Sequence, residues 1–229
     1  MSACCDPAEY DDVFTSKYAR RLAKSFRASG LDDTATKMAD FVTDQGLEGA
    51  TVLEIGGGVG GLHVELLRRG ASRATNIELS TAYEGEAARL LAESGLTDRV
   101  SRRNADLVAD PAAAPDADIV VLHRVVCCYP DFPALLGVAA DHARRMLVFS
   151  YPRPRLLTRA ETAVENLGYA VRGRTFRTFV HSPEAMLAVL ADHGLTPVSG
   201  GRNFRWQYTG TVRGDADSRS DARFVTGMG

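Results

Sequence analysis

The chain has 229 residues, of which 45% are hydrophobic and 24% are charged, a composition typical of a globular protein. Its formal net charge of −2 gives no overall basic field for nucleic acid or an anionic membrane, so we expect neither as a partner. The start of the chain lacks the basic and apolar regions of a signal peptide, and no run of about 18 apolar residues is present. We therefore expect a cytoplasmic protein.

The four cysteines form two adjacent pairs, Cys4-Cys5 and Cys127-Cys128. Neighbouring cysteines rarely form a disulfide with each other, and reduced thiols are the usual state in the cytoplasm. A metal site that combines the two pairs is conceivable, but no C-x-x-C spacing supports it. We expect no bound metal, and we interpret Cys127 and Cys128 as core thiols.

Two helices are indicated before the first strand. Residues Tyr10–Arg27 form a polar, helix-compatible segment that is rich in lysine and arginine. The second helix, Asp32–Gln45, has acidic residues at its start, apolar residues on one face and Gly46 after its end.

Alternating strand and helix patterns follow over residues 50–150, and this alternation predicts a parallel sheet with helices on both faces. The predicted strands are Thr51–Ile55, Ala74–Glu78, Val100–Arg103, Ala117–His123 and Met146–Tyr151. The helices between them are Gly60–Arg69, Thr81–Ser94 and Pro133–Ala143.

The pattern changes after the fifth strand. Residues 152–180 carry six arginines and two glutamates and do not continue the strand–helix repeat. A helix is predicted over Pro183–His193, because Ser182 can cap it and proline suits the first helical position. Two strands, Thr196–Ser199 and Arg205–Arg213, complete the predicted fold, and the polar residues 214–229 are expected to be a disordered tail.

The sequence VLEIGGGVGG, residues 52–61, joins an apolar strand to a glycine cluster and then to a helix. Glycines let the backbone approach a ligand closely, and the N–H groups of the first helical turn face that ligand. From Gly56 to Gly61 the sequence matches G-x-G-x-x-G, which is typical of dinucleotide-binding proteins. From Glu54 to Gly60 it equally matches E-x-G-x-G-x-G, the signature of class I S-adenosylmethionine (SAM) methyltransferases.

Acidic residues follow two further strands. Glu78 ends the second predicted strand, 22 residues after Gly56, where a carboxylate can accept hydrogen bonds from both ribose hydroxyls of a nucleotide. Asp106 follows the third strand, where a carboxylate can accept the exocyclic amine of adenine. Because ligands bind at the carboxyl ends of parallel strands, we expect Glu54, Glu78 and Asp106 to surround one site.

Four segments, in this order, resemble the class I SAM-dependent methyltransferases: VLEIGGGVG (52–60), IELS (77–80), NADL (104–107) and ADIVVLHRVVCCYPD (117–131). The resemblance covers residues 35–213. It implies a Rossmann-like α/β fold, with a seven-stranded, mostly parallel sheet, its last strand antiparallel, and helices on both faces. It also implies SAM as the cofactor and S-adenosylhomocysteine as the product.

The same resemblance assigns roles to single residues. Glu54 approaches the methionine end of SAM, Glu78 holds the ribose, and Asp106 holds the adenine. The other predicted cofactor-binding residues belong to the glycine turn or follow the other strands: Gly56, Gly57, Gly58, Gly60, Leu79, Leu107, His123 and Arg124.

Two histidines are candidate catalytic bases, since imidazole titrates near neutral pH. His123, at the end of the fourth strand, could deprotonate an acceptor hydroxyl, or it could only bind the SAM carboxylate or the backbone. His181 is the second candidate and comes from a different loop. A base is not obligatory, because alignment of the reacting atoms can supply a large part of the catalysis of methyl transfer.

The resemblance implies one domain over residues 1–213. Residues 1–46 are expected to form an N-terminal helical lid, and residues 152–180 an insertion on the acceptor side that is either an arginine clamp or a solvated helix. The motif after the fourth strand is most similar to magnesium-protoporphyrin O-methyltransferases and unassigned actinobacterial methyltransferases. The porphyrin enzymes carry Ile-His-Tyr-Pro where this chain has the sequence Cys-Cys-Tyr-Pro, residues 127–130.

We therefore expect SAM-dependent methyl transfer to a small-molecule acceptor, such as an oxygen of an anionic metabolite or natural product. Two other functions remain open: a non-methylating SAM-binding enzyme of the same fold, such as a cyclase, and, less favoured, a NAD-dependent oxidoreductase. Both a monomer and a homodimer are compatible with the sequence.

Overall fold

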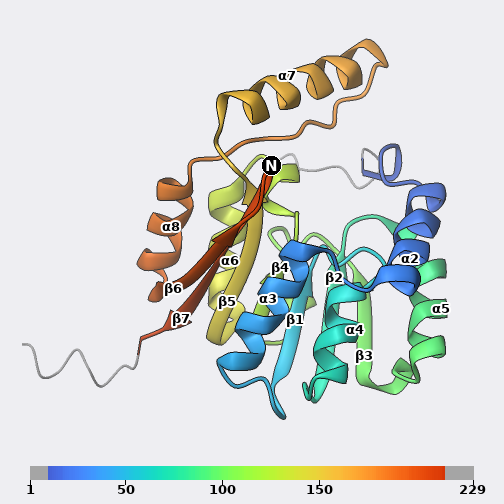
Figure 1. The fold of residues 1–229 in the computed structure, drawn as a ribbon, viewed down its shortest axis with the longest axis vertical. Coiled ribbons are helices and arrows are strands. Elements are labelled where there is room, and N and C mark those ends of the chain that lie inside the picture. The colour runs from blue at the N-terminus through green and yellow to red at the C-terminus, as the bar shows by residue number, and fades with distance from the viewer. Residues whose placement is uncertain (1–9, 215–229) are drawn as a thin grey trace, which may run out of the picture.

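The structure, a computed structural model, describes residues 10–214, and at its centre is a seven-stranded sheet with the order β3-β2-β1-β4-β5-β7-β6 (Figure 1). The strands are β1 (Thr51–Ile55), β2 (Arg73–Glu78), β3 (Val100–Asn104), β4 (Ala117–Leu122), β5 (Ala143–Pro152), β6 (Leu195–Arg202) and β7 (Trp206–Arg213). Strands β1 to β5 pair in parallel, whereas β7 runs antiparallel to both of its neighbours, β5 and β6. The predicted sheet, with its last strand antiparallel, is confirmed.

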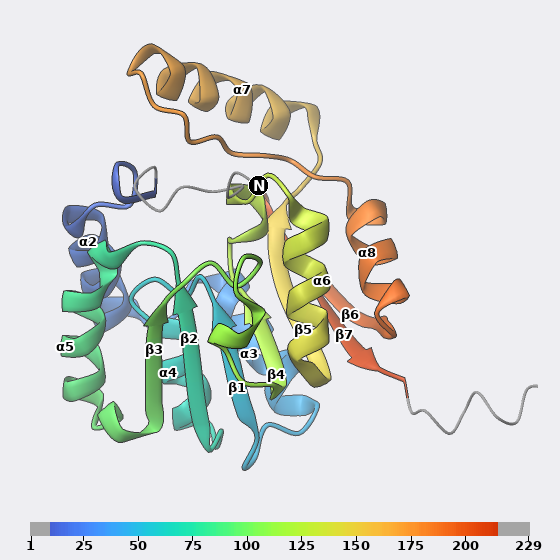
Figure 2. The ribbon, with the colours of Figure 1, turned by 180° about the vertical axis from the view of Figure 1, so that it is seen from behind.

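Helices cover both faces of this sheet. Helices α3 and α4 lie in front of the sheet in Figure 1, and α6 lies in front of it in Figure 2, which shows the opposite side. The helices are α2 (Ser16–Ser29), α3 (Asp33–Asp44), α4 (Gly61–Arg68), α5 (Glu84–Ser94), α6 (Phe132–His142), α7 (Leu156–Val171) and α8 (Pro183–Asp192).

Alternate residues of the central strands fill the two layers between sheet and helices, because successive side chains of a strand point to opposite faces. Val52 and Val121 belong to the core shared with α3 and α4. Leu53, Val120 and Leu122 belong to the core shared with α6 and α8. Since both faces are buried, these strands appear in the sequence as continuous apolar runs.

The helix ends follow from local capping. Asp32 caps α3, and its Oδ1 accepts hydrogen bonds from the N–H groups of Thr34 (3.0 Å) and Ala35 (3.1 Å). Ser182 caps α8 through its side-chain oxygen. Gly95 ends α5 with a φ of 67°, in the left-handed region that favours glycine.

Several predicted boundaries differ from the structure. The predicted helix Thr81–Ser94 is divided into a short 3-10 helix, η1 (Thr81–Tyr83), and α5. Strand β5 begins directly after α6, because its parallel pairing with β4 already starts at Ala143.

Residues 152–180 contain helix α7, which agrees with the solvated helix that was one of the two interpretations of this segment, although its bounds were not predicted. Figures 1 and 2 both show α7 lying apart from the sheet, beyond the ends of the strands. Of its 16 residues, Thr158 is the buried one. Because α7 does not pack into the core, the strand–helix repeat that revealed the other helices gave no sign of it.

Three other expectations concern the N-terminal cysteines, the C-terminal tail and a membrane crossing. Cys4, Cys5 and residues 215–229 of the expected tail lie outside the described residues. Within residues 10–214, no helix combines the length and the apolar character that a membrane crossing requires.

Phe149 provides a test of the core. Its side chain lies on β5 with 0% exposure, whereas Phe204, in the turn between β6 and β7, is 71% exposed. We expect Phe149→Ala to lower the free energy of unfolding by about 3–5 kcal/mol, because it leaves a cavity, and Phe204→Ala to change it by less than about 0.5 kcal/mol. Urea unfolding followed by circular dichroism measures both. Equal stability of the two variants would contradict this description of the core.

Candidate functional site

A cavity of about 210 Å³ lies at the carboxyl ends of the parallel strands, where open α/β sheets bind ligands. Its wall contains residues 56–58 after β1, residues 77–79 at the end of β2, residues 105–107 after β3 and residues 123–125 after β4. Strands β2 and β3 lie on one side of β1, and β4 and β5 lie on its other side. The strand order therefore reverses between β1 and β4, and the cavity lies at the carboxyl ends of these strands. The structure thus brings together four segments that the sequence analysis had selected.

The glycine turn after β1 requires glycine for two separate reasons. Gly56 and Gly58 have φ values of 66° and 56°, which a residue with a side chain rarely adopts. A Cβ on Gly57 would collide with the side chain of Asn76 and would lie 2.6 Å from Cδ of Glu54. The N–H of Gly57 donates to Asn76 Oδ1 at 3.1 Å, so the turn lies directly on the side chains beneath it.

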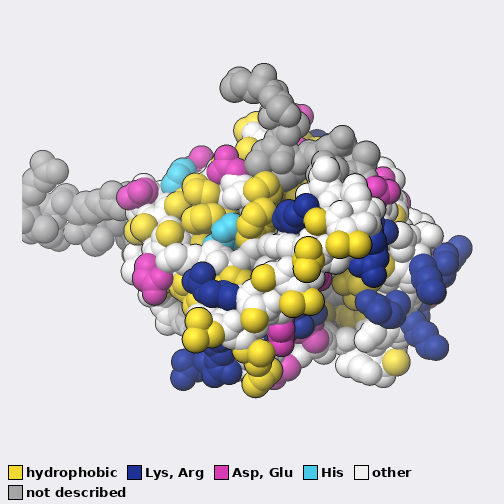
Figure 3. All heavy atoms as spheres, turned by 90° about the horizontal axis from the view of Figure 1, so that it is seen from above, with side chains coloured by type: hydrophobic (Ala, Val, Ile, Leu, Met, Phe, Trp, Pro, Cys, Tyr) yellow, Lys and Arg dark blue, Asp and Glu magenta, His cyan; other side chains and the backbone are white. Residues whose placement is uncertain are grey.

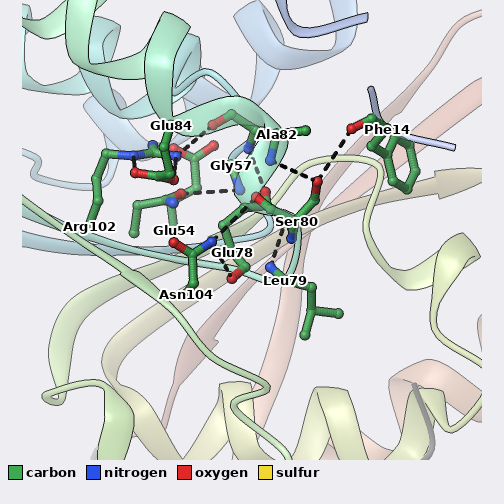
Figure 4. Close-up of polar contacts among 12 residues, drawn as sticks. Phe14, Glu54, Gly57, Glu78, Leu79, Ser80, Ala82, Glu84, Arg102 and Asn104 are labelled. Atoms are coloured by element: carbon green, nitrogen blue, oxygen red, sulfur yellow. Dashed lines mark hydrogen bonds and ion pairs between the residues drawn. The ribbon is translucent and has the colours of Figure 1, made fainter. Parts of the chain in front are cut away.

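Glu78 connects this turn to the end of β2 (Figure 4). Its Oε2 accepts the N–H of Gly58 at 2.9 Å, and its Oε1 accepts the N–H groups of Leu79 (2.8 Å) and Ser80 (3.2 Å). Glu78 is 7% exposed and belongs to the cavity wall. Burial raises the pKa of Glu78, although these hydrogen bonds act in the opposite direction.

Two residues of β3 that the sequence analysis did not select support the same arrangement (Figure 4). The Arg102 guanidinium donates to the backbone oxygen of Gly58 at 2.9 Å and pairs with Glu84 at 2.8 Å. The Asn104 amide donates to the backbone oxygens of Glu78 (3.4 Å) and Ser80 (3.3 Å). In the sequence they are ordinary polar residues of a strand, and only their contacts show what they support.

Asp106 and Leu107 also lie in the cavity wall. Both carboxylate oxygens of Asp106 are 3.1 Å from the Tyr129 hydroxyl, and Oδ1 also accepts the N–H of Val108 at 3.0 Å. These contacts hold the carboxylate at the cavity edge. Leu79 and Leu107, both in the wall, provide apolar surface beside it.

Glu54 is buried under the glycine turn and is 1% exposed. Its Oε2 accepts the backbone N–H of His63 at 3.1 Å and lies 2.5 Å from His63 Nδ1. Gly60, the N-cap residue of α4, has a φ of 89°, and a Cβ there would collide with the His63 ring. Among the described residues, the cavity wall includes neither Glu54 nor Gly60. The expected contact of Glu54 with a ligand stays a prediction that this conformation does not support.

His123 lies in the cavity wall between two other segments of the chain. Its Nε2 is 3.1 Å from Asp32 Oδ2, and its Nδ1 is 3.0 Å from Ser150 Oγ. Ser150 Oγ also accepts the N–H of Arg124 at 2.9 Å. Because the Asp32 carboxylate can only accept, Nε2 of His123 is the donor in their contact.

Asp32 is a cavity residue that the sequence analysis identified only as the start of a helix. Burial raises the pKa of Asp32, but its hydrogen bond to His123 and the charges of His123 and Arg124 outweigh burial, so the pKa lies below its ordinary value. No local sequence signal could have revealed this contact, because 91 positions separate Asp32 from His123.

Arg124 has a φ of 59°, an unusual value for a residue with a side chain. Its guanidinium lies 3.1 Å from Asp32 Oδ2 and 4.7 Å from the centre of the Trp206 ring. These contacts hold a cation at the cavity wall, of which Arg124 is part.

His181 is outside the cavity wall that the described residues form. Its Nε2 lies 3.1 Å from the backbone oxygen of Val126 and 3.3 Å from that of Tyr129. Burial lowers the pKa of His181 and so favours the neutral ring. Of the two predicted bases, the structure therefore brings only His123 to the cavity.

Residues 10–15, which we call the N-terminal strap, connect two sides of the cavity. The Tyr10 hydroxyl donates to the backbone oxygen of Cys128 at 2.8 Å. On the other side, the Ser80 hydroxyl donates to Asp11 Oδ1 at 2.5 Å. The strap is therefore anchored both to the segment after β4 and to the end of β2.

Aromatic side chains cover the cavity beside these anchors. The wall includes Tyr10 and Phe14 of the strap and Tyr18 and Leu22 of α2. Phe176 is buried but is not part of this wall, and its ring centre lies 5.4 Å from that of Tyr10 and 5.5 Å from that of Phe14. This arrangement is compatible with the predicted lid.

Cys127 and Cys128 are free thiols with their sulfur atoms 3.6 Å apart, and Cys128 reaches the cavity wall. The hydrogen bond to Cys127 and burial both raise the pKa of Cys128, so its thiol is protonated at neutral pH. Within residues 10–214, no group of three or more histidine, cysteine, aspartate or glutamate side chains is arranged to hold a metal ion.

Gly57 provides a test of the turn. Because an added Cβ collides with Asn76 and Glu54, we expect Gly57→Ala to lower the free energy of unfolding by about 1–3 kcal/mol. The matched control is Gly85→Ala in α5, where no atom lies within 4 Å of the added Cβ and where we expect a gain of about 0.5–1 kcal/mol. Urea unfolding compares the two variants. A stable Gly57→Ala protein would contradict the close packing of the turn.

The family model described as a methyltransferase domain matches residues 19–199. A comparison with curated protein sequences found no significant match. Among solved structures, the chain is similar to a magnesium protoporphyrin IX methyltransferase from Synechocystis PCC 6803 with bound S-adenosylhomocysteine. The identity is 20%, the TM-score is 0.71, and the match covers 91% of this chain and 100% of the other.

Two further solved structures show the same fold. An O-methyltransferase family protein from Burkholderia thailandensis has 20% identity and a TM-score of 0.68, over 88% of this chain and 61% of the other. A geranyl diphosphate C-methyltransferase from Streptomyces coelicolor A3(2) has 17% identity and a TM-score of 0.60, over 78% of this chain and 77% of the other. From the match of the family model over most of its length, the chain belongs to the methyltransferase-domain family, and its fold is that of the class I SAM-dependent methyltransferases.

Proposed function

We propose that the protein transfers a methyl group from SAM to a small-molecule acceptor at the carboxyl edge of its sheet. The observation that carries this proposal is the meeting of the glycine turn, Glu78 and Asp106 in the wall of one cavity, in a chain of the methyltransferase-domain family. SAM supplies a methyl group bound to a positively charged sulfur. The positive charge makes the methyl carbon an electrophile.

The charges of the cavity wall support SAM as the ligand. The wall contains three carboxylates, Asp32, Glu78 and Asp106, and one guanidinium, that of Arg124. SAM carries an ammonium group, a sulfonium and one carboxylate, so the signs are complementary. The pyrophosphate of NAD would instead add negative charge beside these carboxylates, which disfavours the oxidoreductase alternative.

The donor and acceptor groups suggest how the ligand is held. Glu78 Oε2 has one hydrogen bond in the structure and keeps capacity to accept a ribose hydroxyl. Asp106 is placed for the adenine amine, with Leu79 and Leu107 as apolar neighbours of the ring. The backbone of residues 56–58 would follow the amino-acid portion, since glycine leaves room for close approach there.

Arg124 and Asp32 are the proposed partners of the ligand's carboxylate and ammonium groups, and His123 orients both. Nε2 of His123 donates to Asp32 and Nδ1 faces Ser150, so proton abstraction from an acceptor would require His123 to separate from one of these partners. We therefore assign catalysis mainly to alignment of the reacting atoms, with the N-terminal strap excluding water.

The proposed acceptor is small, and we propose an oxygen as its methylated atom. Aromatic and apolar side chains of the strap, α2 and the segment after β4 form the other side of the cavity. The six arginines of residues 152–180 lie outside the cavity wall that the described residues form, and Arg124 is assigned to the carboxylate of SAM, so the cavity itself adds no support for an anionic acceptor.

The function is tested with the purified full-length protein. Calorimetry measures binding of SAM, S-adenosylhomocysteine and NAD, and mass spectrometry follows the release of S-adenosylhomocysteine when isotopically labelled SAM is mixed with fractionated cell extracts. Binding of SAM together with a labelled methylated product supports the proposal. Failure of SAM and its product to bind at micromolar concentration would sink it, and turnover of SAM without a methylated product would favour the non-methylating alternative.

Glu78 separates ligand binding from stability. We expect Glu78→Gln to weaken the binding of S-adenosylhomocysteine by roughly tenfold to hundredfold, because the amide has one acceptor oxygen and no charge. Glu48→Gln, an exposed change with the same chemistry, should leave binding unaltered. Calorimetry of both variants makes the comparison, and equal affinities would remove Glu78 from the proposed site.

The same variant should alter the pH dependence of stability. Burial raises the pKa of Glu78 above its ordinary value of 4.5, so the stabilising contribution of the bound proton is full below pH 4.5. That contribution is lost as the pH rises through the raised pKa. Glutamine has no such proton, and we expect the unfolding free energy of Glu78→Gln to fall less steeply with pH above about 4.5 than that of the wild type.

The N-terminal strap is tested by its anchor to Ser80. We expect Asp11→Ala to increase the dissociation rate of S-adenosylhomocysteine roughly fivefold, because the lost hydrogen bond favours an open strap. Asp12→Ala, at the exposed neighbouring position, is the matched control. Stopped-flow displacement measures the rates. If Asp11→Ala releases the ligand as slowly as Asp12→Ala, the strap does not close the site.

A further inference from the structure

Helix α7 carries an apolar face that no described residue covers. Leu156 is 87% exposed, Val164 71%, Leu167 64% and Val171 80%. Their spacing places them on one side of an α-helix, and Leu157, 55% exposed, lies at the edge of the same side. A connected apolar surface of this kind marks an interaction site more often than scattered exposed side chains do.

The opposite side of α7 is fixed to the rest of the protein. The Tyr169 ring packs edge-on against Phe176, with 5.3 Å between ring centres. The Asn166 side chain donates to the backbone oxygen of Thr178 and accepts the N–H of the same residue, both at 2.8 Å. The contacts therefore hold α7 with its apolar face turned away from the protein.

A neighbouring turn extends this face. Phe204, between β6 and β7, is 71% exposed, and the Arg155 guanidinium lies 5.7 Å from the centre of its ring. Arg205, next in the chain, is 3.8 Å from Glu161 of α7. We define the α7 surface as Leu156, Leu157, Val164, Leu167, Val171 and Phe204.

The segment that carries most of the α7 surface has an excess of positive charge. Residues 152–177 contain six arginines and two glutamates, although the whole chain has a net charge of −2. One of those glutamates, Glu165, lies on the packed side of the helix, where its carboxylate accepts hydrogen bonds from the hydroxyls of Tyr169 and Thr178. Figure 3, which looks onto the end of the molecule where α7 lies, shows exposed hydrophobic side chains with basic side chains and some acidic ones among them.

We propose that the α7 surface binds an anionic lipid bilayer. An amphipathic helix with arginines beside its apolar face lies in the interface of such a bilayer, where the apolar side chains leave water and the arginines meet anionic headgroups. The overall charge of the chain predicts no such partner, but the charge is unevenly distributed. Helix α7 lies on the bilayer in this arrangement and does not cross it.

A second copy of the chain fits this surface less well. With 16 residues, α7 is about 24 Å long, and one face of such a helix provides much less than the roughly 800 Å² per partner that a stable dimer buries. Two copies would also bring their arginine-rich segments together. Charge complementarity therefore favours an anionic partner.

The experiment is flotation of the full-length protein with vesicles. We expect binding to vesicles of equimolar phosphatidylcholine and phosphatidylglycerol, weaker binding as salt is added, and little binding to phosphatidylcholine alone. The variant Leu156→Gln/Val164→Gln/Leu167→Gln should lower the bound fraction about tenfold, because glutamine keeps the helix but removes the apolar contact. Val198→Gln, at a 51% exposed residue of β6 outside the α7 surface, is the matched control and should bind as the wild type does.

A second variant, Arg159→Gln/Arg172→Gln, tests the charges while it leaves the apolar residues of the α7 surface in place, and it should also lower binding. Circular dichroism and S-adenosylhomocysteine binding of each variant show whether the fold is retained, independently of lipid. Absence of wild-type flotation with the anionic vesicles overturns the proposal, as does equal flotation of the wild type and both α7 variants. Sedimentation velocity could instead show a wild-type dimer that the triple variant Leu156→Gln/Val164→Gln/Leu167→Gln converts to a monomer. That result would identify a second copy as the occupant and overturn the proposal.

Discussion

The backbone after β1 passes directly over the side chains of Asn76 and Glu54, and the rest of the site depends on this close approach. At Gly57 a single added carbon would collide with both of them. The approach allows the N–H of Gly58 to reach Glu78, which connects the turn to the end of β2. A larger residue at Gly57 would move the turn outward and separate these groups, so the cavity exists because the turn has no side chain there.

Several layers of contacts maintain this geometry. Beneath the turn, Glu54 pairs with the buried His63, and beside it Arg102 holds the backbone of Gly58. Above the cavity, the N-terminal strap is anchored on two sides. Methyl transfer needs alignment and the exclusion of water more than a strong base, and this arrangement offers both. The site therefore depends on supporting residues that do not contact the proposed ligand, as much as on the carboxylates that line it.

The two ends of the molecule obey different constraints. The central strands are buried on both faces, so their apolar runs, and the helices between them, could be predicted from the sequence. For residues 152–180 a solvated helix was only one of two interpretations, and the bounds of α7 were not predicted, because it packs through Asn166 and Tyr169 and leaves its apolar face in solvent. Asp32 was missed for a related reason: the sequence identifies a helix cap, while its contacts with His123 and Arg124 join segments far apart in the chain.

By itself, the sequence determined the order along the chain of the strands and helices other than α7, the glycine turn, and the presence of acids at the ends of β2 and β3, because each of these has a local pattern. It also predicted, through resemblance, the family and fold that the comparisons confirm. Only the tertiary structure decided which of these residues face the cavity. It placed Glu54 against His63, directed His181 to backbone oxygens, and brought Asp32 to the site. The physical reason is that a side chain's direction depends on partners distant in sequence, and no local pattern records them.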